Sequence, residues 1–274
     1  MTLDEAARCL AEAGIEGARR EARLLLAHAL DGDRDTTLTV NPTAEQSAAF
    51  AALIARRAGR EPFAYITGRK EFWSLTFDVG PGVLIPRPDT ETLIEQAIRF
   101  LPDREAPLAI ADLGAGSGAL LIAALTEFPR AMGIGFESSP QAFGYLSRNI
   151  ARHVPDRAQA RLAAWDAAPK DAGAPFDLIL SNPPYIPAAE IESLDPDVSR
   201  YEPRAALDGG EDGLEAYRSL GLLLPHILNP GGHAILDIGA GQGNSMEPLF
   251  PGLEIVALAP DLQGIARALV LRKS

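Results

Sequence analysis

Short apolar runs alternate with helical stretches over most of the chain, and this alternation limits the folds that it can adopt. Strands are expected at residues 108–113, 132–136, 160–164, 176–181, 232–238 and 254–258. Helices are expected at residues 90–101, 118–128, 140–153 and 213–224. Repeated strand–helix units build a parallel sheet with helices on both faces, which places a ligand at the carboxyl ends of the strands. The sequence therefore predicts an α/β domain with its site at that edge.

The N-terminal part of the chain has a different pattern. Apolar residues at helical spacing predict helices at residues 3–13 and 17–30, and Thr43 with Gln46 three residues later predicts the start of a third helix. From residue 64 to residue 84, β-branched and aromatic residues broken by glycines predict a hairpin. A chain of 274 residues exceeds the usual size of one domain. We therefore expect a helical domain at residues 1–70, a hairpin linker at 71–90 and the α/β domain at 91–274.

Composition and charge exclude several classes of protein. The formal net charge is −12, whereas a protein that binds naked nucleic acid usually carries a basic surface. The N-terminus has no basic region followed by a long apolar segment, and no run approaches the roughly 18 apolar residues that span a bilayer. The four histidines show no ligand spacing. We expect a cytoplasmic protein with no membrane contact, no stable nucleic-acid binding and no metal.

The segment at residues 112–118, Asp-Leu-Gly-Ala-Gly-Ser-Gly, follows an apolar strand and opens an apolar helix. Its glycine spacing differs from the dinucleotide pattern Gly-x-Gly-x-x-Gly. Glycines in this position leave room for the methionine part of S-adenosylmethionine (SAM), and Asp112 can reach the SAM ammonium group. The predicted cofactor-binding residues here are Asp112, Gly114, Ala115, Gly116, Ser117 and Gly118. A glycine turn without any ligand is the alternative.

The next two strands end in side chains that suit the rest of SAM. Glu137 lies about twenty residues further on, where an acidic side chain can accept hydrogen bonds from both ribose hydroxyls. Trp165 and Asp166 follow the third strand and offer a flat apolar surface and an acceptor beside the expected adenine. Taken singly, Glu137 is also explained as a solvated acid and Trp165 as core packing. Three consecutive strands with these endings favour the cofactor interpretation.

The fourth strand ends in Ser-Asn-Pro-Pro-Tyr at residues 181–185. The prolines fix the backbone and remove its donors, so the side-chain oxygen of Asn182 and the carbonyl of Pro183 can both accept hydrogen bonds from one NH2 group. Tyr185 offers a ring on which a planar amide or a base can stack. We predict Asn182, Pro183 and Tyr185 as catalytic residues, and these three with Pro184 as the substrate-binding residues.

A second glycine segment, Asp-Ile-Gly-Ala-Gly-Gln-Gly at residues 237–243, looks like a copy of the first. Few residues remain after it to complete a nucleotide-binding half. We interpret it as a turn from a strand into a loop that borders the substrate pocket.

These motifs, together with several others, resemble the peptide chain release factor glutamine methyltransferases. The further segments are ARLLLAH at residues 22–28, EPFAYITG at 61–68, LIPRPDTE at 84–91, YEPRAAL at 201–207 and DLQG at 261–264. The glycine turn and Asn-Pro-Pro-Tyr are shared with many amino-methyltransferases, whereas the N-terminal and junction segments are far more specific. The resemblance covers nearly the whole chain and implies a Rossmann-like class I methyltransferase sheet preceded by a small helical domain and a hairpin.

The resemblance implies SAM-dependent methylation of the side-chain nitrogen N5 of the glutamine in the Gly-Gly-Gln loop of bacterial class I release factors. It implies that residues 114–118, Glu137, Trp165 and Asn182 contact SAM, that residues 182–185 hold the glutamine, and that the N-terminal domain recognises the protein substrate. The family usually has Asp where this chain has Glu137, and Glu where it has Asp89. Both differences keep the charge.

Three other functions stay open at this point. An exocyclic NH2 of adenine or guanine presents the same two donors to Asn-Pro-Pro-Tyr, so a nucleic-acid methyltransferase is one alternative. A methyltransferase acting on a ribosomal-protein glutamine is the second. A SAM-binding protein without turnover is the third, and the intact segment at residues 182–185 argues against it.

Overall fold

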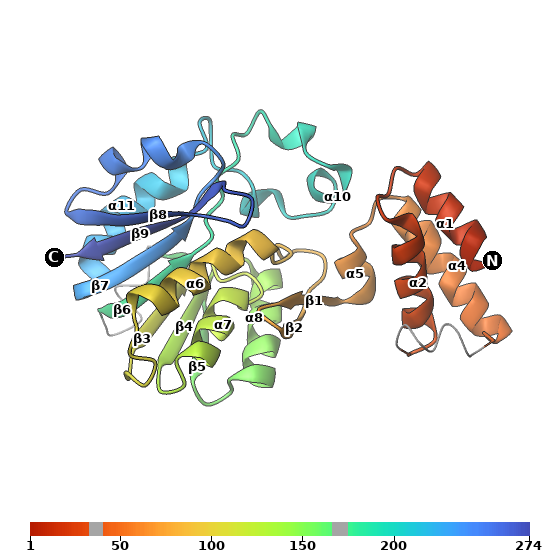
Figure 1. Ribbon diagram of the computed structural model, residues 1–274, viewed down its shortest axis with the longest axis horizontal. Coiled ribbons are helices and arrows are strands. Elements are labelled where there is room, and N and C mark those ends of the chain that lie inside the picture. Colours follow the sequence, from red (N-terminus) through yellow and green to blue (C-terminus); the bar gives the residue numbers. More distant parts are fainter. Residues whose placement is uncertain (33–40, 166–174) are drawn as a thin grey trace. The chain divides into compact units, whose positions relative to one another are not determined.

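The computed structural model describes residues 1–32, 41–165 and 175–274 (Figure 1). The chain forms two compact units. One contains Met1–Arg69 together with Asp195–Tyr201, and the other contains Lys70–Leu194 and Glu202–Ser274. A short segment from the C-terminal half of the chain therefore belongs to the N-terminal unit.

The N-terminal unit consists of helices α1 (Leu3–Glu12), α2 (Ala18–Ala29), α4 (Ala44–Ala58) and α5 (Phe63–Thr67). Figure 1 shows α1, α2 and α4 side by side, and each of them contacts the other two. Thr43 caps α4 in the predicted capping box with Gln46, since each side chain accepts a hydrogen bond from the other residue's backbone N–H. Leu10, Leu25 and Phe50 are buried where these helices meet. The three predicted helices are confirmed.

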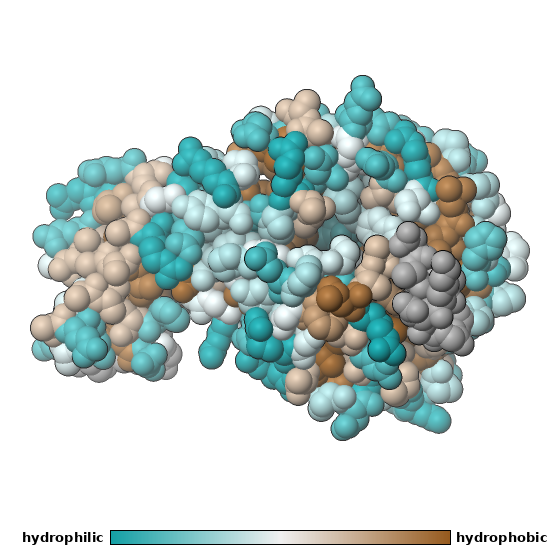
Figure 2. Space-filling view, turned by 180° about the vertical axis from the view of Figure 1, so that it is seen from behind, coloured by the Kyte–Doolittle hydropathy of each residue, from teal (hydrophilic) through white to brown (hydrophobic). Residues whose placement is uncertain are grey.

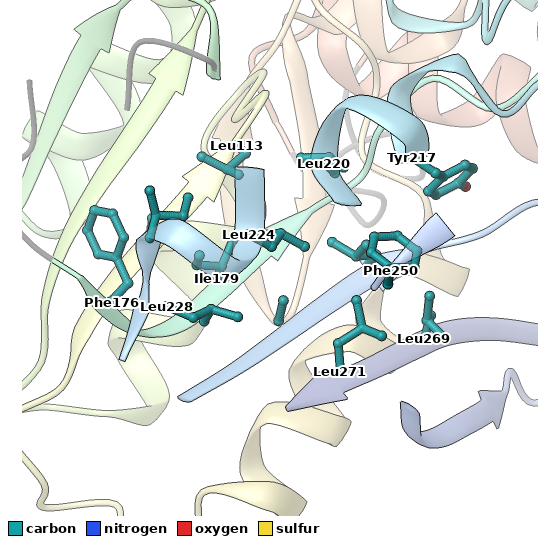
Figure 3. Packing of buried hydrophobic residues seen from close by; sticks show 14 of the residues in the cluster. Leu113, Phe176, Ile179, Tyr217, Leu220, Leu224, Leu228, Phe250, Leu269 and Leu271 are labelled. Atoms are coloured by element: carbon teal, nitrogen blue, oxygen red, sulfur yellow. The ribbon is translucent and has the colours of Figure 1, made fainter. Parts of the chain in front are cut away.

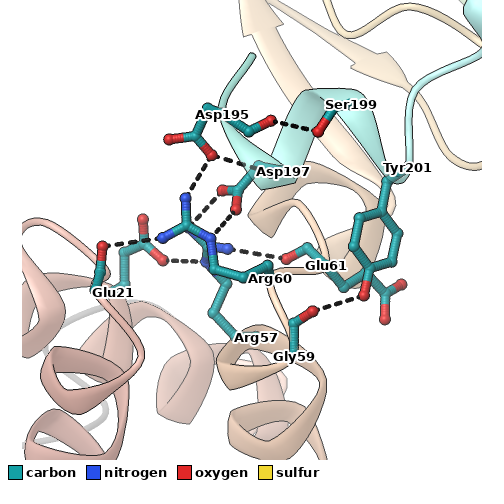
Figure 4. A network of polar contacts seen from close by, with 10 residues as sticks. Glu21, Arg57, Gly59, Arg60, Glu61, Asp195, Asp197, Ser199 and Tyr201 are labelled. Carbon is teal, nitrogen blue, oxygen red and sulfur yellow. Dashed lines mark hydrogen bonds and ion pairs between the residues drawn. The ribbon is translucent and has the colours of Figure 1, made fainter. Parts of the chain in front are cut away.

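Arg57 is the buried centre of a polar network in the same unit (Figure 4). Its side chain is 6% exposed and pairs with Glu21 at 2.6 Å and with Asp197 at 2.8 Å. Arg60 pairs with Asp195, and the hydroxyl of Tyr201 donates to the carbonyl of Gly59 at 2.8 Å. These contacts hold the segment Asp195–Tyr201, which includes α10 (Pro196–Ser199), against the helices of the N-terminal unit.

The predicted hairpin is present but begins later than expected. Strands β1 (Arg69–Phe72) and β2 (Leu75–Asp78) form a two-stranded sheet joined by two residues with positive φ. The expectation of strand from residue 64 was wrong, because residues 63–67 form α5. Pro62 at the start of α5 has its φ preset near the helical value, and Gly68 ends the helix in the left-handed conformation.

The other unit is built on a seven-stranded sheet. Its strands are β3 (Ala109–Leu113), β4 (Met132–Glu137), β5 (Ala158–Leu162), β6 (Phe176–Ser181), β7 (Leu228–Asp237), β8 (Leu253–Pro260) and β9 (Ala266–Lys273), in the order β5-β4-β3-β6-β7-β9-β8. The first five are parallel, as predicted, while β9 pairs antiparallel with both β7 and β8. Strand β9 was not predicted, because it returns from β8 through a turn without an intervening helix.

Helices cover both faces of this sheet, which confirms the α/β prediction. They are α6 (Glu91–Phe100), α7 (Ala119–Glu127), α8 (Pro140–His153) and α11 (Glu215–Ile227), with short helical turns η1 (Pro88–Thr90), η3 (Ile191–Ser193), η4 (Arg204–Ala206), η5 (Gln242–Ser245) and η6 (Glu247–Leu249). Side chains alternate along a strand. Asp112 of β3 accepts a hydrogen bond from the backbone of α7, whereas its neighbours Ala111 and Leu113 pack in the cluster that contains α11.

The main core of this unit lies between α11 and the sheet (Figure 3). Leu220 and Leu224 of α11 are fully buried there with Ile179 of β6, and Leu269 and Leu271 contribute from β9. A fully buried leucine contributes about 1.5–3 kcal/mol relative to an exposed one. This core fixes the strands whose ends carry the site.

The surface is largely polar on the face shown in Figure 2, where hydrophobic residues occur in small separate areas. Large exposed hydrophobic side chains include Leu222 on α11 and Leu262 between β8 and β9. Scattered residues of this kind are normal at protein surfaces. Among the helices of the described residues, we find none with the length and apolar character needed to cross a membrane.

Candidate active site

A cavity of about 470 Å³ lies at the carboxyl ends of the parallel strands. Strand β3 has β4 on one side and β6 on the other, so the direction of the strand order reverses there. Ligands bind at such a point in open α/β sheets. The predicted site residues that line the cavity are Asp112, Gly114, Ala115, Gly116, Ser117, Glu137, Trp165, Asn182 and Pro184. The fold therefore brings together residues from four different strand ends.

The glycine-rich loop turns sharply between β3 and α7. Gly114, Gly116 and Gly118 all have positive φ, at 78°, 56° and 83°, which glycine adopts without steric cost. The backbone N–H groups of Gly114 and Ala115 both donate to the carbonyl of Phe136 on β4, each at 2.9 Å. Gly118 is not among the cavity-lining residues, and a Cβ there would lie 2.8 Å from Leu146. Glycine is favoured at this position by its positive φ and by the closeness of Leu146.

Asp112 is a buried charged group in the cavity wall. It is 1% exposed, and its Oδ2 accepts a hydrogen bond from the backbone N–H of Leu121 at 3.2 Å. Within the described part of the chain, its Oδ1 has no hydrogen-bond partner. Burial, and secondarily the nearby charge of Glu137, raise the pKa of Asp112 to about 7. A buried carboxylate oxygen without a partner at a cavity wall is suited to a cationic ligand.

Glu137, at the end of β4, is buried and holds the glycine loop. Its Oε2 accepts a hydrogen bond from the backbone N–H of Gly116 at 2.9 Å, and its Oε1 accepts one from Ser139 at 2.7 Å. A carboxylate can accept about four hydrogen bonds, so about two positions remain for hydroxyl donors. The side chain therefore combines a structural role with free acceptor capacity at the cavity.

Trp165 lies beyond the end of β5 and is half-buried. Its indole N–H donates to the hydroxyl of Ser219 at 3.2 Å, and its ring also packs against the main core. A Cβ on Gly114 would lie 3.5 Å from the Trp165 ring, so the indole adjoins the glycine loop. The predicted Asp166 lies outside the described residues. Strand β5 itself ends at Leu162, two residues before the predicted end.

The Asn-Pro-Pro-Tyr segment follows β6 directly. Asn182 and Pro184 line the cavity, while Pro183 is buried and neither Pro183 nor Tyr185 is among the lining residues. The side-chain amide of Asn182 donates from Nδ2 to Oγ1 of Thr90 at 3.4 Å. Burial raises the pKa of Tyr185, so its hydroxyl stays protonated. Only part of the predicted substrate-binding segment therefore faces the cavity in this structure.

The second glycine segment lies next to Asn-Pro-Pro-Tyr and is a turn out of β7, as predicted. Gln242 joins the two loops, because its Nε2 donates to the carbonyl of Tyr185 at 3.0 Å and to that of Gly213 at 3.2 Å. Its Oε1 accepts a hydrogen bond from the backbone N–H of Gly239 at 2.8 Å. The segment supports the loop at residues 182–185 and takes no part in lining the cavity.

Sequence reasoning missed some residues of the site. Thr90 at the start of α6 and Arg87 before it line the cavity, as do Pro203, Ala205 and Ala206. Glu202 is buried and ties these segments together, since it pairs with Arg87 and accepts a hydrogen bond from the backbone N–H of Ile85 at 3.1 Å. The only sequence signal for them was their place in the segments LIPRPDTE and YEPRAAL.

Comparisons with known proteins agree with this fold. The PrmC N-terminal domain family matches residues 2–68, and the methyltransferase small domain family matches residues 91–194. Among solved structures, a methyltransferase from Pyrococcus furiosus is similar with a TM-score of 0.52 and 20% identity, over 80% of this chain and 97% of that one. The fold is that of the class I methyltransferases.

Curated relatives define the family more closely. A release factor glutamine methyltransferase of Geobacter sulfurreducens is 44% identical over 88% of this chain and 84% of its own length. One of Rhodospirillum rubrum is 42% identical over 99% of this chain and 84% of its own length. The chain belongs to the release factor glutamine methyltransferase family.

Proposed function

We propose that this protein transfers a methyl group from SAM to the side-chain nitrogen N5 of the glutamine in the Gly-Gly-Gln motif of peptide chain release factors. The observation that carries the proposal is the 44% identity, over 88% of the chain, to a protein named for glutamine methylation of release factors. The site supports it independently, because its acceptors suit one ligand with an ammonium group and another with an NH2 group.

The residues of the cavity fit SAM. The unpartnered Oδ1 of Asp112 suits the ammonium group of the methionine part, and the glycine loop leaves room beside it. Glu137 keeps acceptor capacity for the ribose hydroxyls, and the Trp165 ring offers a flat apolar surface for the adenine. We propose that Asp166 accepts a hydrogen bond beside the adenine, and that Gly118, although outside the cavity lining, belongs to the glycine loop that makes room for the methionine part. When bound, SAM supplies an electrophilic methyl group.

Asn182 acts on the nucleophile. An amide nitrogen is a weak nucleophile because its lone pair is delocalised into the carbonyl. We propose that Oδ1 of Asn182 and the carbonyl oxygen of Pro183 each accept a hydrogen bond from one N–H group of the substrate amide. Pro184 and the Tyr185 ring enclose this amide. Alignment of this kind supplies up to roughly 7–11 kcal/mol, and one positioned electrostatic partner contributes about 3–4 kcal/mol. No base is needed before transfer, because the proton leaves afterwards.

The substrate is a protein loop in this proposal. Glycines beside the target glutamine carry no side chains that collide with the walls formed by residues 182–185, so the glutamine can enter a narrow opening. We propose that the helical domain at residues 1–70 binds the remainder of the release factor, with the hairpin at 71–90 as linker and residues 91–274 as the methyltransferase domain. The net charge of −12 disfavours nucleic acid as the partner. Such a substrate places the enzyme in the cytoplasm.

Methyl transfer from labelled SAM tests the proposal directly. The purified protein is incubated in parallel with a release factor, a release factor whose Gly-Gly-Gln glutamine is changed to glutamate, ribosomal proteins, and duplex and single-stranded DNA. We expect label in the first sample alone, and mass mapping should place the methyl group on the glutamine. Label in ribosomal protein or DNA with an unmodified release factor would overturn the substrate assignment.

A further inference from the structure

Three polar side chains from distant parts of the sequence form a chain of hydrogen bonds that begins at the cavity wall. Thr90 is at the end of η1, Asp237 is the last residue of β7, and Asn182 follows β6. Thr90 donates from Oγ1 to Oδ2 of Asp237 at 2.8 Å, and Asn182 donates from Nδ2 to Oγ1 of Thr90 at 3.4 Å. Thr90 is 4% exposed and Asp237 is 2% exposed. Both are thus shielded from water that would compete for these bonds.

In this chain of hydrogen bonds, each group can take only one role as donor or acceptor. Burial raises the pKa of Asp237 to about 6, so at pH 8 its carboxylate is ionised and can only accept. A threonine hydroxyl carries a single proton, and Thr90 uses it in the hydrogen bond that it donates to Asp237. The Thr90 oxygen can then only accept from Asn182, and the only donor on the Asn182 side chain is Nδ2. The carbonyl oxygen of the same amide, Oδ1, must therefore point away from Thr90.

The position of Asp237 is fixed by its surroundings. Its backbone pairs with Ala268 of β9, and its carbonyl accepts a hydrogen bond from the hydroxyl of Tyr217 at 2.9 Å. The adjacent Ile238 donates its backbone N–H to the carbonyl of Arg267 at 2.8 Å. A carboxylate whose backbone is held in this way, and whose Oδ1 has no hydrogen-bond partner among the described residues, leaves Thr90 as the anchor of its side chain.

We propose that Thr90 and Asp237 are positioning residues that hold the Asn182 amide in one orientation, with Oδ1 presented to the N–H of the substrate amide. The proposal rests on the proposed function in assigning that substrate. If the amide were free to rotate by half a turn, Nδ2 would face the substrate NH2 group, and two donors would oppose each other. Neither Thr90 nor Asp237 was singled out as a site residue by sequence reasoning.

Threonine variants separate the hydroxyl from the shape of the side chain. Thr90→Val keeps the shape and removes the hydroxyl, and Thr90→Ser keeps the hydroxyl. At pH 8 with release factor as substrate, we expect Thr90→Val to lower kcat by about 10- to 100-fold, with an unchanged Kd for SAM. Thr90→Ser should restore kcat to within about threefold of the wild type. Thr92→Val, at a buried threonine of α6 outside the cavity wall, is the matched control and should keep full activity.

A double-mutant cycle tests whether Asp237 acts through Thr90. Asp237→Asn offers Thr90 a donor and removes the fixed direction, so it should lower kcat by itself. Once the hydroxyl is gone in Thr90→Val, adding Asp237→Asn should change kcat by less than about twofold. Thr90→Ala takes the place of Thr90→Val if thermal melting shows that the valine variant is unfolded.

Several results would overturn the proposal. Full kcat in Thr90→Val, equal losses in the Val and Ser variants, or multiplicative losses in the double variant would each show that the hydroxyl does not orient Asn182. Absence of methyl transfer to the release factor by the wild-type enzyme is a different result, because it overturns the proposed function and is seen before any variant is measured.

Discussion

Replacing Asp112 by asparagine should stabilise the ligand-free protein and, at the same time, remove most of its affinity for SAM. The carboxyl is buried, and Oδ1 has no partner within the described residues. Asparagine keeps the shape of the side chain, and its carbonyl oxygen can still accept a hydrogen bond from the backbone N–H of Leu121. The variant loses the negative charge. In the wild type this charge destabilises the ligand-free protein and attracts the ammonium group of SAM.

The size of the expected change in the free energy of unfolding follows from the pKa of Asp112. Asp112 has a pKa of about 7 in the folded protein against an ordinary value of 3.8. One pKa unit corresponds to about 1.4 kcal/mol, so ionisation of this carboxyl costs the folded state up to about 4 kcal/mol. Because the folded state binds the proton more tightly, the wild-type free energy of unfolding falls as pH rises from about 4 to about 7. The gain in free energy of unfolding from Asp112→Asn should be absent at about pH 4 and complete above about pH 7.

Urea unfolding at about pH 4 and about pH 8.5, together with calorimetric titration of SAM at about pH 8.5, measures both effects. Asp177→Asn is the matched control, because both oxygens of Asp177 accept hydrogen bonds, from Ala109 at 2.8 Å and from Asn229 at 2.7 Å. The control should lose stability and keep SAM affinity. If Asp112→Asn were less stable than the wild type and bound SAM equally well, Asp112 would be a structural residue and the electrostatic reasoning would be refuted.

Three further changes have defined outcomes. Gly116→Val should abolish SAM binding in calorimetry, because a branched side chain enters the cavity and φ at this position is 56°; unchanged affinity in a folded variant would exclude this loop as the cofactor site. Gln242→Ala should lower kcat and leave the SAM Kd unchanged, since it frees the carbonyl of Tyr185; a changed Kd with normal kcat would contradict this. Arg57→Ala should lower the free energy of unfolding by about 1–3 kcal/mol, because Glu21 loses its ion pair with Arg57 and Asp197 keeps only its ion pair with Arg60. Arg56→Ala, at a more exposed ion pair, should cost about 0–1 kcal/mol in the same urea titration.

The helices and strands that could be predicted are those whose own sequence segment carries a clear pattern. Strand β6 and helix α8 have the predicted bounds, because each is a strong periodic run between clear start and stop residues. Strand β9 was missed although its sequence is apolar, since a hairpin strand leaves no helix as a marker. The relevant signal was the turn before it, where Asp261 accepts hydrogen bonds from the backbone of Gln263 and Ile265, and Gly264 has positive φ.

The candidate site shows a similar division. Residues at strand ends could be predicted, because parallel strands bring their carboxyl ends to one edge of the sheet. Thr90 could not be predicted, since it contacts Asp237, which lies 147 positions away in the sequence. Contacts of this kind depend on the strand order, and a repeating pattern of strands and helices does not determine which strands are neighbours.

The two glycine segments show how small the deciding signal can be. Gly-Ala-Gly-Ser-Gly at residues 114–118 and Gly-Ala-Gly-Gln-Gly at 239–243 differ only in Ser117 and Gln242. Gln242 is long enough to fold back, accept the N–H of Gly239 and donate to the carbonyl of Tyr185, so its own side chain occupies the interior of the turn. Ser117 is too short to do this, and its loop remains beside an open cavity. In this chain the side chain between the last two glycines, together with the positive φ of Gly114 and Gly118, distinguishes the turn beside the cavity from the turn that fills itself.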